Sequence, residues 1–167
     1  MSSVIIAITL TLATLSSIYL IEKVGRKCLI SLSSAFMGLG AFSMGTFFYL
    51  KENGSAELIQ NISWLPLISL IIFELAFSVG YGPVCYIIGA EILNSSIRSV
   101  VSPIAVGFNW LCVFAVAKTY PDLVNFLGTS GTFYLYGSLA VLGLVFTLIF
   151  VPETKGKTEE EIQMYFR

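Results

Sequence analysis

The sequence predicts an all-α polytopic membrane protein with five transmembrane helices. Hydrophobic residues make up 56% of its 167 positions, the mean hydropathy is +0.88, and charged residues make up only 11%. Charged residues make up about a quarter of an ordinary soluble domain, so this composition excludes a soluble domain of the ordinary kind. A transmembrane helix needs roughly 20 apolar residues, which leaves room for about five helices and no separate soluble domain.

Apolar runs separated by polar segments set the predicted boundaries. The transmembrane region covers residues 1–157, with spans at about residues 4–21, 28–50, 64–90, 100–117 and 131–151. Residues 158–167 form a short amphipathic tail that opens on a Thr-x-x-Glu capping box, Thr158 to Glu161. In the second span, small side chains recur on one helical face, which predicts close packing on a neighbouring helix; they are Ser34, Gly38, Ala41 and Gly45.

The groups that enzymes and metal sites need are scarce in this sequence. There is no histidine, and the three cysteines lie in or beside apolar spans without the spacing of metal ligands. We therefore expect no enzyme activity, no metal and no cofactor. The net charge of −1 does not indicate a nucleic-acid partner.

The third predicted span carries an acidic side chain at membrane depth, Glu74. Glu74, Ser78 and Tyr81 fall at helical spacing and share one face. Two interpretations of Glu74 stay open. It is either a functional carboxylate that faces a cavity, or a carboxylic acid kept neutral by burial that bonds a neighbouring helix.

Farther along this span, Gly80, Gly82 and Pro83 predict a break in the helix. Lipid cannot satisfy the backbone groups that a break frees, so a break is tolerated only against other helices or a watery cavity. The pattern therefore favours a transport protein over a simple membrane anchor.

The fourth predicted span carries Asn109 beside Trp110. Tryptophan prefers the interfacial belts of a membrane, so a central tryptophan next to an amide favours a polar lumen. A packing role for both side chains stays open. The following segment, residues 118–130, is polar enough to predict a loop before the fifth span.

Basic residues near the span ends predict the orientation of the chain. Two of them, Lys51 and Lys118, lie on one side, and seven lie on the other, namely Lys23, Arg26, Lys27, Arg98, Lys155, Lys157 and Arg167. The positive-inside rule then places the amino terminus outside and the carboxyl terminus in the cytosol. We expect an integral protein of the plasma membrane, with the lipid bilayer around it.

Four local patterns stand in a fixed order against the predicted spans. They are Glu22-Lys-Val-Gly-Arg-Lys27, Gly80-Tyr-Gly-Pro-Val84, Glu91 with Arg98, and Pro152-Glu-Thr-Lys-Gly156. Together they resemble the carboxyl-terminal half of the sugar-porter family of the major facilitator superfamily, in particular glucose-transporter-like and insect facilitated trehalose transporters. The resemblance covers essentially the whole chain and implies that its five spans are helices eight to twelve of twelve.

The resemblance also implies a network of charges on the cytosolic side. In this family such charges form a network of contacts that is made in one transport state and broken in the other. The network therefore contributes to the free-energy difference between the two states. The implied members are Glu22, Arg26, Lys27, Glu91, Arg98 and Glu153. The alternative is that these charges only satisfy the positive-inside topology.

Substrate contacts are implied by the same resemblance. The matching positions are Tyr86, where the family usually has Trp, and the pair Asn109 and Trp110. Ser78 stands where related hexose transporters carry an acid, and Glu74 lies one turn earlier. Amide and phenol groups hydrogen-bond sugar hydroxyls, and an aromatic face covers the apolar side of a sugar ring.

The function that we expect is facilitated movement of a sugar, a hexose or a disaccharide such as trehalose. Helix seven and the amino-terminal half of the family have no counterpart in the sequence, and alternating access needs two halves. The chain is therefore expected to be a fragment of a full transporter, with the missing amino-terminal half as its partner. The alternative is a truncated, non-transporting membrane paralogue that acts as a binding or regulatory partner.

The predicted orientation can be tested by glycosylation mapping and protease protection. Asn94-Ser-Ser forms an acceptor pattern that should stay unmodified, because it is predicted to lie in the cytosol. A tag placed after residue 167 should resist protease in sealed, right-side-out cells. Glycosylation at Asn94 or digestion of the tag would overturn this topology.

Overall fold

The structure, a computed structural model, is a bundle of helices. It describes residues 14, 17, 19–21, 23–54, 56–157 and 159–164. The elements, in order, are α2 (Arg26–Asn53), α3 (Ala56–Asn61), α4 (Leu65–Ala76), the π-helix η1 (Phe77–Tyr81), α5 (Gly82–Ile92), α6 (Ser95–Phe150) and α7 (Glu159–Met164). Within these described ranges there is no strand, and the predicted all-α fold is confirmed. Most of the first predicted span, residues 4–21, lies outside the described residues.

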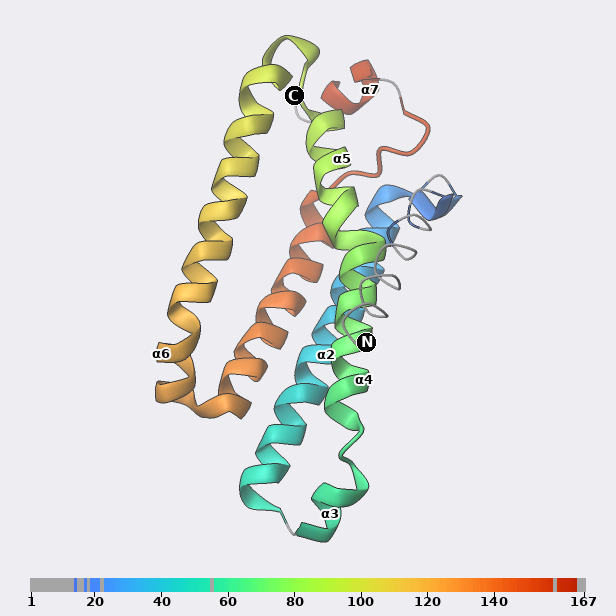
Figure 1. Cartoon of the computed structure of the whole chain (residues 1–167). Coiled ribbons are helices and arrows are strands. Elements are labelled where there is room, and N and C mark those ends of the chain that lie inside the picture. The colour runs from blue at the N-terminus through green and yellow to red at the C-terminus, as the bar shows by residue number, and fades with distance from the viewer. Residues whose placement is uncertain are drawn as a thin grey trace.

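The long helices run up and down beside one another (Figure 1). α4, η1 and α5 form one continuous rod that returns alongside α2, and α6 descends and comes back as a hairpin. The start of α2, the end of α5 and α7 all lie toward the upper end of the bundle in Figure 1, and α3 lies at the lower end. Among the described residues, three helical stretches are long and apolar enough to cross a membrane, Arg26–Asn53, Leu65–Ile92 and Ser96–Phe150.

The hairpin of α6 turns at a single residue. Its backbone is helical throughout except at Gly128, whose φ of 74° and ψ of 169° reverse the chain direction. A positive φ of this kind is open to glycine because it has no Cβ. Gly128 therefore divides α6 into a first arm, residues 95–127, and a second arm, residues 129–150.

This arrangement differs from the loop that we expected over residues 118–130, which is helical on both sides of Gly128. The expectation rested on the polarity of the segment. Long polar side chains at the end of a membrane helix can reach the interface without leaving the helix, so polarity alone does not require a loop.

α2 lies between the second arm of α6 and α4. Gly45 approaches the ring of Tyr134 on α6, where an added Cβ would lie 3.0 Å from the ring, and Gly40 approaches the carbonyl oxygen of Ser69 on α4. Phe48 and Phe133 stack with ring centroids 5.6 Å apart. The predicted small-residue face of α2 thus packs on a neighbouring helix, and the opposite side of α2 does the same.

The buried hydrophobic core of the described residues lies between α2 and α5. Its members are Ile21, Leu29, Ile30, Val84 and Ile88, and Val84 is fully buried. On α7, Ile162 is also buried, and α7 packs against α5. The core is therefore concentrated toward the end of the bundle where α2 begins.

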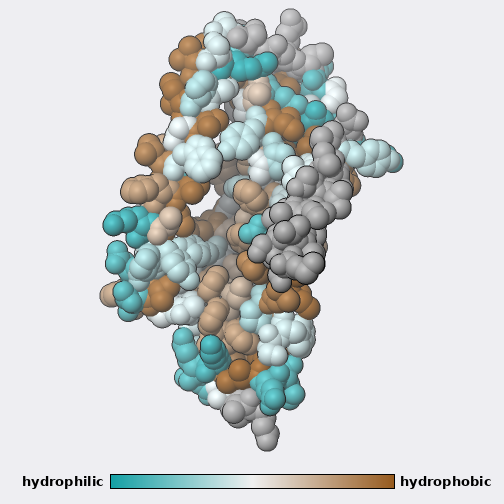
Figure 2. Space-filling model, viewed as in Figure 1, coloured by the Kyte–Doolittle hydropathy of each residue, from teal (hydrophilic) through white to brown (hydrophobic). Residues whose placement is uncertain are grey.

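The first arm of α6 has little cover from the other described residues. Every residue from 103 to 122 is exposed, whichever side of the helix it occupies. Figure 2 shows hydrophobic side chains along this arm and an opening between it and the rest of the molecule. A helix that is apolar and exposed on all sides needs lipid or further helices around it.

The close contact between α2 and α4 can be tested at Gly40. In Gly40→Ala the new Cβ would lie 2.9 Å from the Ser69 carbonyl oxygen and 3.2 Å from the Phe73 Cβ. We expect this crowding to lower the free energy of unfolding by about 1–3 kcal/mol. The measurement is thermal unfolding in detergent, with Gly107→Ala as the control, because nothing lies within 4 Å of that position. Equal stability of the two variants would contradict the packing described.

Candidate functional site

The carboxylate of Glu153, which is distant in sequence, caps the start of α2. One oxygen accepts a hydrogen bond from the backbone N–H of Arg26 at 3.0 Å, and the other accepts from the N–H of Lys27 at 3.2 Å. The first N–H groups of a helix have no partner inside the helix, and a negative charge there is favoured by the helix dipole. Glu153 supplies both the hydrogen bonds and the charge across 127 positions of sequence.

Gly25 makes room for this cap. Its φ is 98°, a conformation that side-chain-bearing residues rarely adopt. A Cβ at this position would also lie 2.7 Å from the Glu153 Oε2. Both the backbone conformation and the space beside the carboxylate therefore require glycine before α2.

Glu91, in the last turn of α5, connects two other parts of the same end. Its Oε1 lies 3.0 Å from the Arg26 Nη2 in an ion pair, and its Oε2 accepts a 2.6 Å hydrogen bond from the Thr154 hydroxyl. The side chains of Arg26 and Glu91 are only 20% and 27% exposed. Partial shielding from water makes the pair less sensitive to salt than a surface ion pair.

Two lysine ammonium groups bind backbone carbonyls at this end. Lys27 Nζ donates to the carbonyl oxygen of Leu148 at 2.8 Å, and Lys155 Nζ donates to that of Lys23 at 2.6 Å. Leu148 lies in the last turn of α6, where carbonyl groups lack helical partners and a cation is favoured. We call this set of residues the charged end; it comprises Arg26, Lys27, Glu91, Glu153, Thr154 and Lys155.

The structure brings together four of the six predicted network residues, Arg26, Lys27, Glu91 and Glu153. Arg98 uses its Nη2 to donate to the carbonyl oxygen of Leu93 at 3.0 Å, beside the turn from α5 to α6. Glu22 lies outside the described residues. Thr154 was not predicted, although it belongs to the Pro-Glu-Thr-Lys-Gly pattern. Its burial, at 3% exposed, is visible only in the structure.

The segment around Gly80, Gly82 and Pro83 is widened, and the helix is not interrupted. The π-helix η1 leads directly into α5, in which Pro83 occupies the first turn. In an α-helix a proline ring clashes with the carbonyl four residues earlier, and a π-helical turn relieves that spacing. This corrects the expected break: the backbone stays helical because the turn widens just before the proline.

Two of the predicted substrate residues meet in the structure. The Tyr86 hydroxyl on α5 donates to the Asn109 Oδ1 on the first arm of α6 at 3.4 Å. Both side chains are exposed, and Trp110, beside Asn109, is 66% exposed. Ser78 is half-buried in η1. The pair of Tyr86 and Asn109 therefore presents a phenol and an amide on open surface, and Trp110, with its exposed indole, is the next residue of α6 after Asn109.

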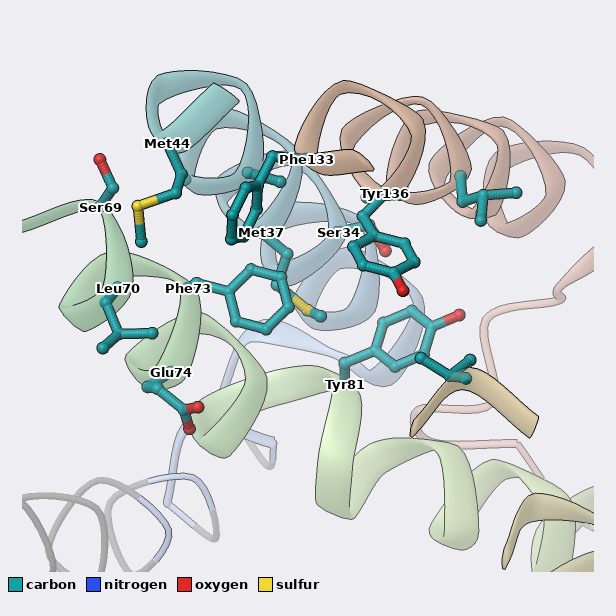
Figure 3. Close-up of a pocket in the computed structure, with 16 residues that line it drawn as sticks. Ser34, Met37, Met44, Ser69, Leu70, Phe73, Glu74, Tyr81, Phe133 and Tyr136 are labelled. Carbon is teal, nitrogen blue, oxygen red and sulfur yellow. The ribbon is translucent and has the colours of Figure 1, made fainter. Parts of the chain in front are cut away.

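A separate cavity of about 490 Å³ opens between α2, α4, η1 and both arms of α6 (Figure 3). Of the predicted substrate residues only Glu74 lines it. Figure 3 shows the rings of Tyr81 and Tyr136 side by side, with the Glu74 carboxylate toward the opposite side. Apolar side chains supply most of the remaining lining, among them Met37, Met44, Phe73 and Phe133.

Glu74 was expected to face either a cavity or a neighbouring helix, and both Glu74 and Tyr81, which shares its face, line this cavity. Ser34 also lines it, although its small-residue face was expected only to pack on a neighbouring helix. Tyr136 gave no sequence signal, because an aromatic residue in an apolar span is ordinary. The cavity and the Tyr86–Asn109 pair are two distinct places in the bundle.

The fold is that of the major facilitator superfamily of membrane transporters. The xylose transporter XylE from E. coli in an inward-open conformation matches with a TM-score of 0.82 and 32% identity, over 96% of this chain and 34% of that one. A double-tryptophan mutant of XylE matches with a TM-score of 0.85 and 31% identity, over 99% of this chain and 34% of that one.

The family follows from the sequence comparison. The family model described as "Sugar (and other) transporter" matches residues 1–166, and the chain belongs to this family. Facilitated trehalose transporter Tret1 of Culex quinquefasciatus is 41% identical over 96% of this chain and 31% of its own length. Tret1 of Apis mellifera ligustica is 40% identical over 99% of this chain and 32% of its own length. The chain thus spans about a third of the length of these two relatives.

The cap on α2 can be tested by comparing two glycines. Gly25→Ala places an alanine at a positive φ and pushes it against Glu153, whereas Gly156→Ala meets the same kind of backbone conformation with nothing within 4 Å. A positive φ costs roughly 1–2 kcal/mol for alanine. Because both variants carry that cost, it cancels in the comparison. Gly25→Ala also crowds the Glu153 carboxylate away from the two N–H groups that it caps, so we expect it to lose about 1–3 kcal/mol more stability than Gly156→Ala, measured as unfolding in detergent. Equal losses would show that Glu153 does not crowd Gly25.

Proposed function

We propose that this chain is part of a transporter that moves a sugar, a hexose or a disaccharide such as trehalose, across the membrane by facilitated alternating access. Membership of the sugar transporter family supports the class of substrate. The similar proteins named above, trehalose and xylose transporters, support a small sugar as cargo. No covalent chemistry is part of this proposal.

The observation that carries the proposal is the contact between Tyr86 and Asn109. A phenol and an amide 3.4 Å apart on two helices can together bond neighbouring hydroxyl groups of a sugar ring. The exposed ring of Trp110 is suited to the apolar face of a sugar. The pair lies on open surface, so a ligand can reach it without displacing a helix.

The charged end supports a conformational cycle. It joins the start of α2, the end of α5 and the segment after α6 through one ion pair and several hydrogen bonds. We infer that this end faces the cytosol and is closed in one transport state and open in the other. A partly shielded ion pair is suited to such a role, because forming or breaking it changes the free-energy difference between the closed and the open state.

The exposed first arm of α6 supports a longer assembly. Its residues 103–122 are all exposed in the described part of the chain, and the relatives named above are about three times as long. We infer that further helices, including an amino-terminal half, pack against this arm. The sugar would then be enclosed between the two halves, as alternating access requires.

Labelled-trehalose uptake tests this proposal in a split transporter. The chain would be co-expressed with the amino-terminal part of a similar Tret1 transporter, and we expect uptake only when both parts are present. Tyr86→Phe should lower uptake about fivefold, because one hydrogen bond is worth about 1 kcal/mol. Tyr49→Phe is the matched control, since Tyr49 is equally exposed but lies on α2.

Two results would count against the proposal. Equal uptake by Tyr86→Phe and Tyr49→Phe would remove Tyr86 from the sugar site. Absence of uptake from a correctly inserted pair would favour the non-transporting paralogue.

A further inference from the structure

Ser33 of α2 reaches into the π-helical turn of the neighbouring rod. Its hydroxyl donates to the Ala76 carbonyl oxygen at 2.6 Å and accepts from the Tyr81 backbone N–H at 3.0 Å. The side chain is 5% exposed, so water does not compete for these two bonds. One hydroxyl therefore serves two backbone groups of another helix.

The two groups that Ser33 bonds are five residues apart. A π-helix pairs each carbonyl with the N–H five positions later, whereas an α-helix pairs it with the N–H four positions later. A hydroxyl can donate and accept at once, so it can bridge Ala76 and Tyr81 only while they face each other. The contact of Ser33 is thus specific for the π-helical form of this turn.

Gly80 permits this contact. A Cβ on Gly80 would lie 2.6 Å from the Ser33 Cβ and 2.8 Å from the Leu29 carbonyl oxygen. Real Cβ atoms do not approach other heavy atoms so closely, so any larger residue would push α2 away from η1. Gly80, predicted as a helix breaker, acts here as the point of closest approach between two helices.

The π-helical turn determines which way the side chains of α5 point. It contains one residue more than an α-helical turn, and one residue corresponds to a rotation of about 100°. In the observed register Val84 and Ile88 are buried, and Tyr86 is exposed beside Asn109. If the turn became α-helical, each residue of α5 would take the direction now held by the residue after it.

We propose that Ser33 is a positioning residue that holds η1 in its π-helical form and thereby aims Tyr86 at Asn109. Without the hydroxyl, the α-helical register becomes accessible and Tyr86 turns away from its partner. The statement that this pair contacts sugar rests on the proposed function. The effect of Ser33 on the register does not, and it can be measured without any sugar.

Cysteine reactivity on α5 tests the register directly. The chain would carry serine in place of Cys28, Cys85 and Cys112, with a single reporter cysteine, either Val84→Cys or Ile87→Cys. In the observed register position 84 is fully buried and position 87 is half-buried. After the rotation, position 84 would take the exposed direction of position 85, and position 87 the buried direction of position 88.

Adding Ser33→Ala should therefore raise the rate of maleimide labelling at position 84 and lower it at position 87. Loss of two hydrogen bonds of about 1 kcal/mol each shifts the equilibrium between the two registers by about 30-fold, and the two labelling rates should change in opposite directions by up to that factor. The matched control is Ser34→Ala. Ser34 is the next residue and 2% exposed, and its hydroxyl has no hydrogen-bond partner among the described residues. This control should leave both rates unchanged.

The opposite signs at the two reporters separate a change of register from general loosening. Rates that rise together at both positions, or that do not change, would overturn the proposal. Gly80→Ala is a second route to the same register change, with Gly89→Ala as its control because nothing lies within 4 Å of Gly89. Circular dichroism would establish that each variant keeps its helices.

Trehalose uptake by the split transporter distinguishes the two proposals. If reactivity shifts as expected but no variant or wild-type pair transports sugar, the register role of Ser33 stands and the proposed function fails. If uptake is normal in Ser33→Ala and reactivity is unchanged, the proposed function stands and Ser33 has no positioning role.

Discussion

The bond between the Glu153 carboxylate and the start of α2 is the interaction on which the charged end depends. α2 has no side-chain cap of its own, because Gly25 precedes it. A buried N–H without a partner costs about 1–3 kcal/mol, so the first turn of α2 needs an acceptor from elsewhere. Once Glu153 is in place, Thr154 is held beside Glu91, and Glu91 in turn pairs with Arg26. One carboxylate thereby aligns three separate segments.

Close approach of backbones is the second constraint, and α2 is the helix that permits it. Its small residues allow α6 to pack on one side and α4 on the other, and Gly80 brings η1 within reach of a short serine side chain. Hydrogen bonds between membrane helices are short-range, so they form only where small residues let the helices meet. The close packing of α2 against η1 is therefore what allows Ser33 to bond the π-helical turn.

Apolar spans are written in consecutive residues, so they were sufficient to predict the helical membrane fold. The charge network was an expectation from the family resemblance, and the structure brings four of its six residues, Arg26, Lys27, Glu91 and Glu153, to one end of the bundle. The reversal was predicted within residues 118–130, but this segment was expected to be a loop, whereas the chain is helical on both sides of a single turning residue, Gly128. The π-helical turn was read as a break, since glycine and proline disfavour an α-helix in either case. The cavity is lined by side chains from α2, α4, η1 and α6, among them Ser34 and Tyr136. No local sequence pattern indicates that these side chains meet.

The distance in sequence between α2 and its cap has a consequence for the order of assembly. During synthesis α2 leaves the ribosome long before residue 153 exists, and a membrane helix can insert before it finds its partners. Until then the N–H groups of Arg26 and Lys27 can be satisfied only by water at the membrane surface. Glu153 replaces that water after the hairpin of α6 has been inserted. The charged end can therefore close only after the second arm of α6 has been made.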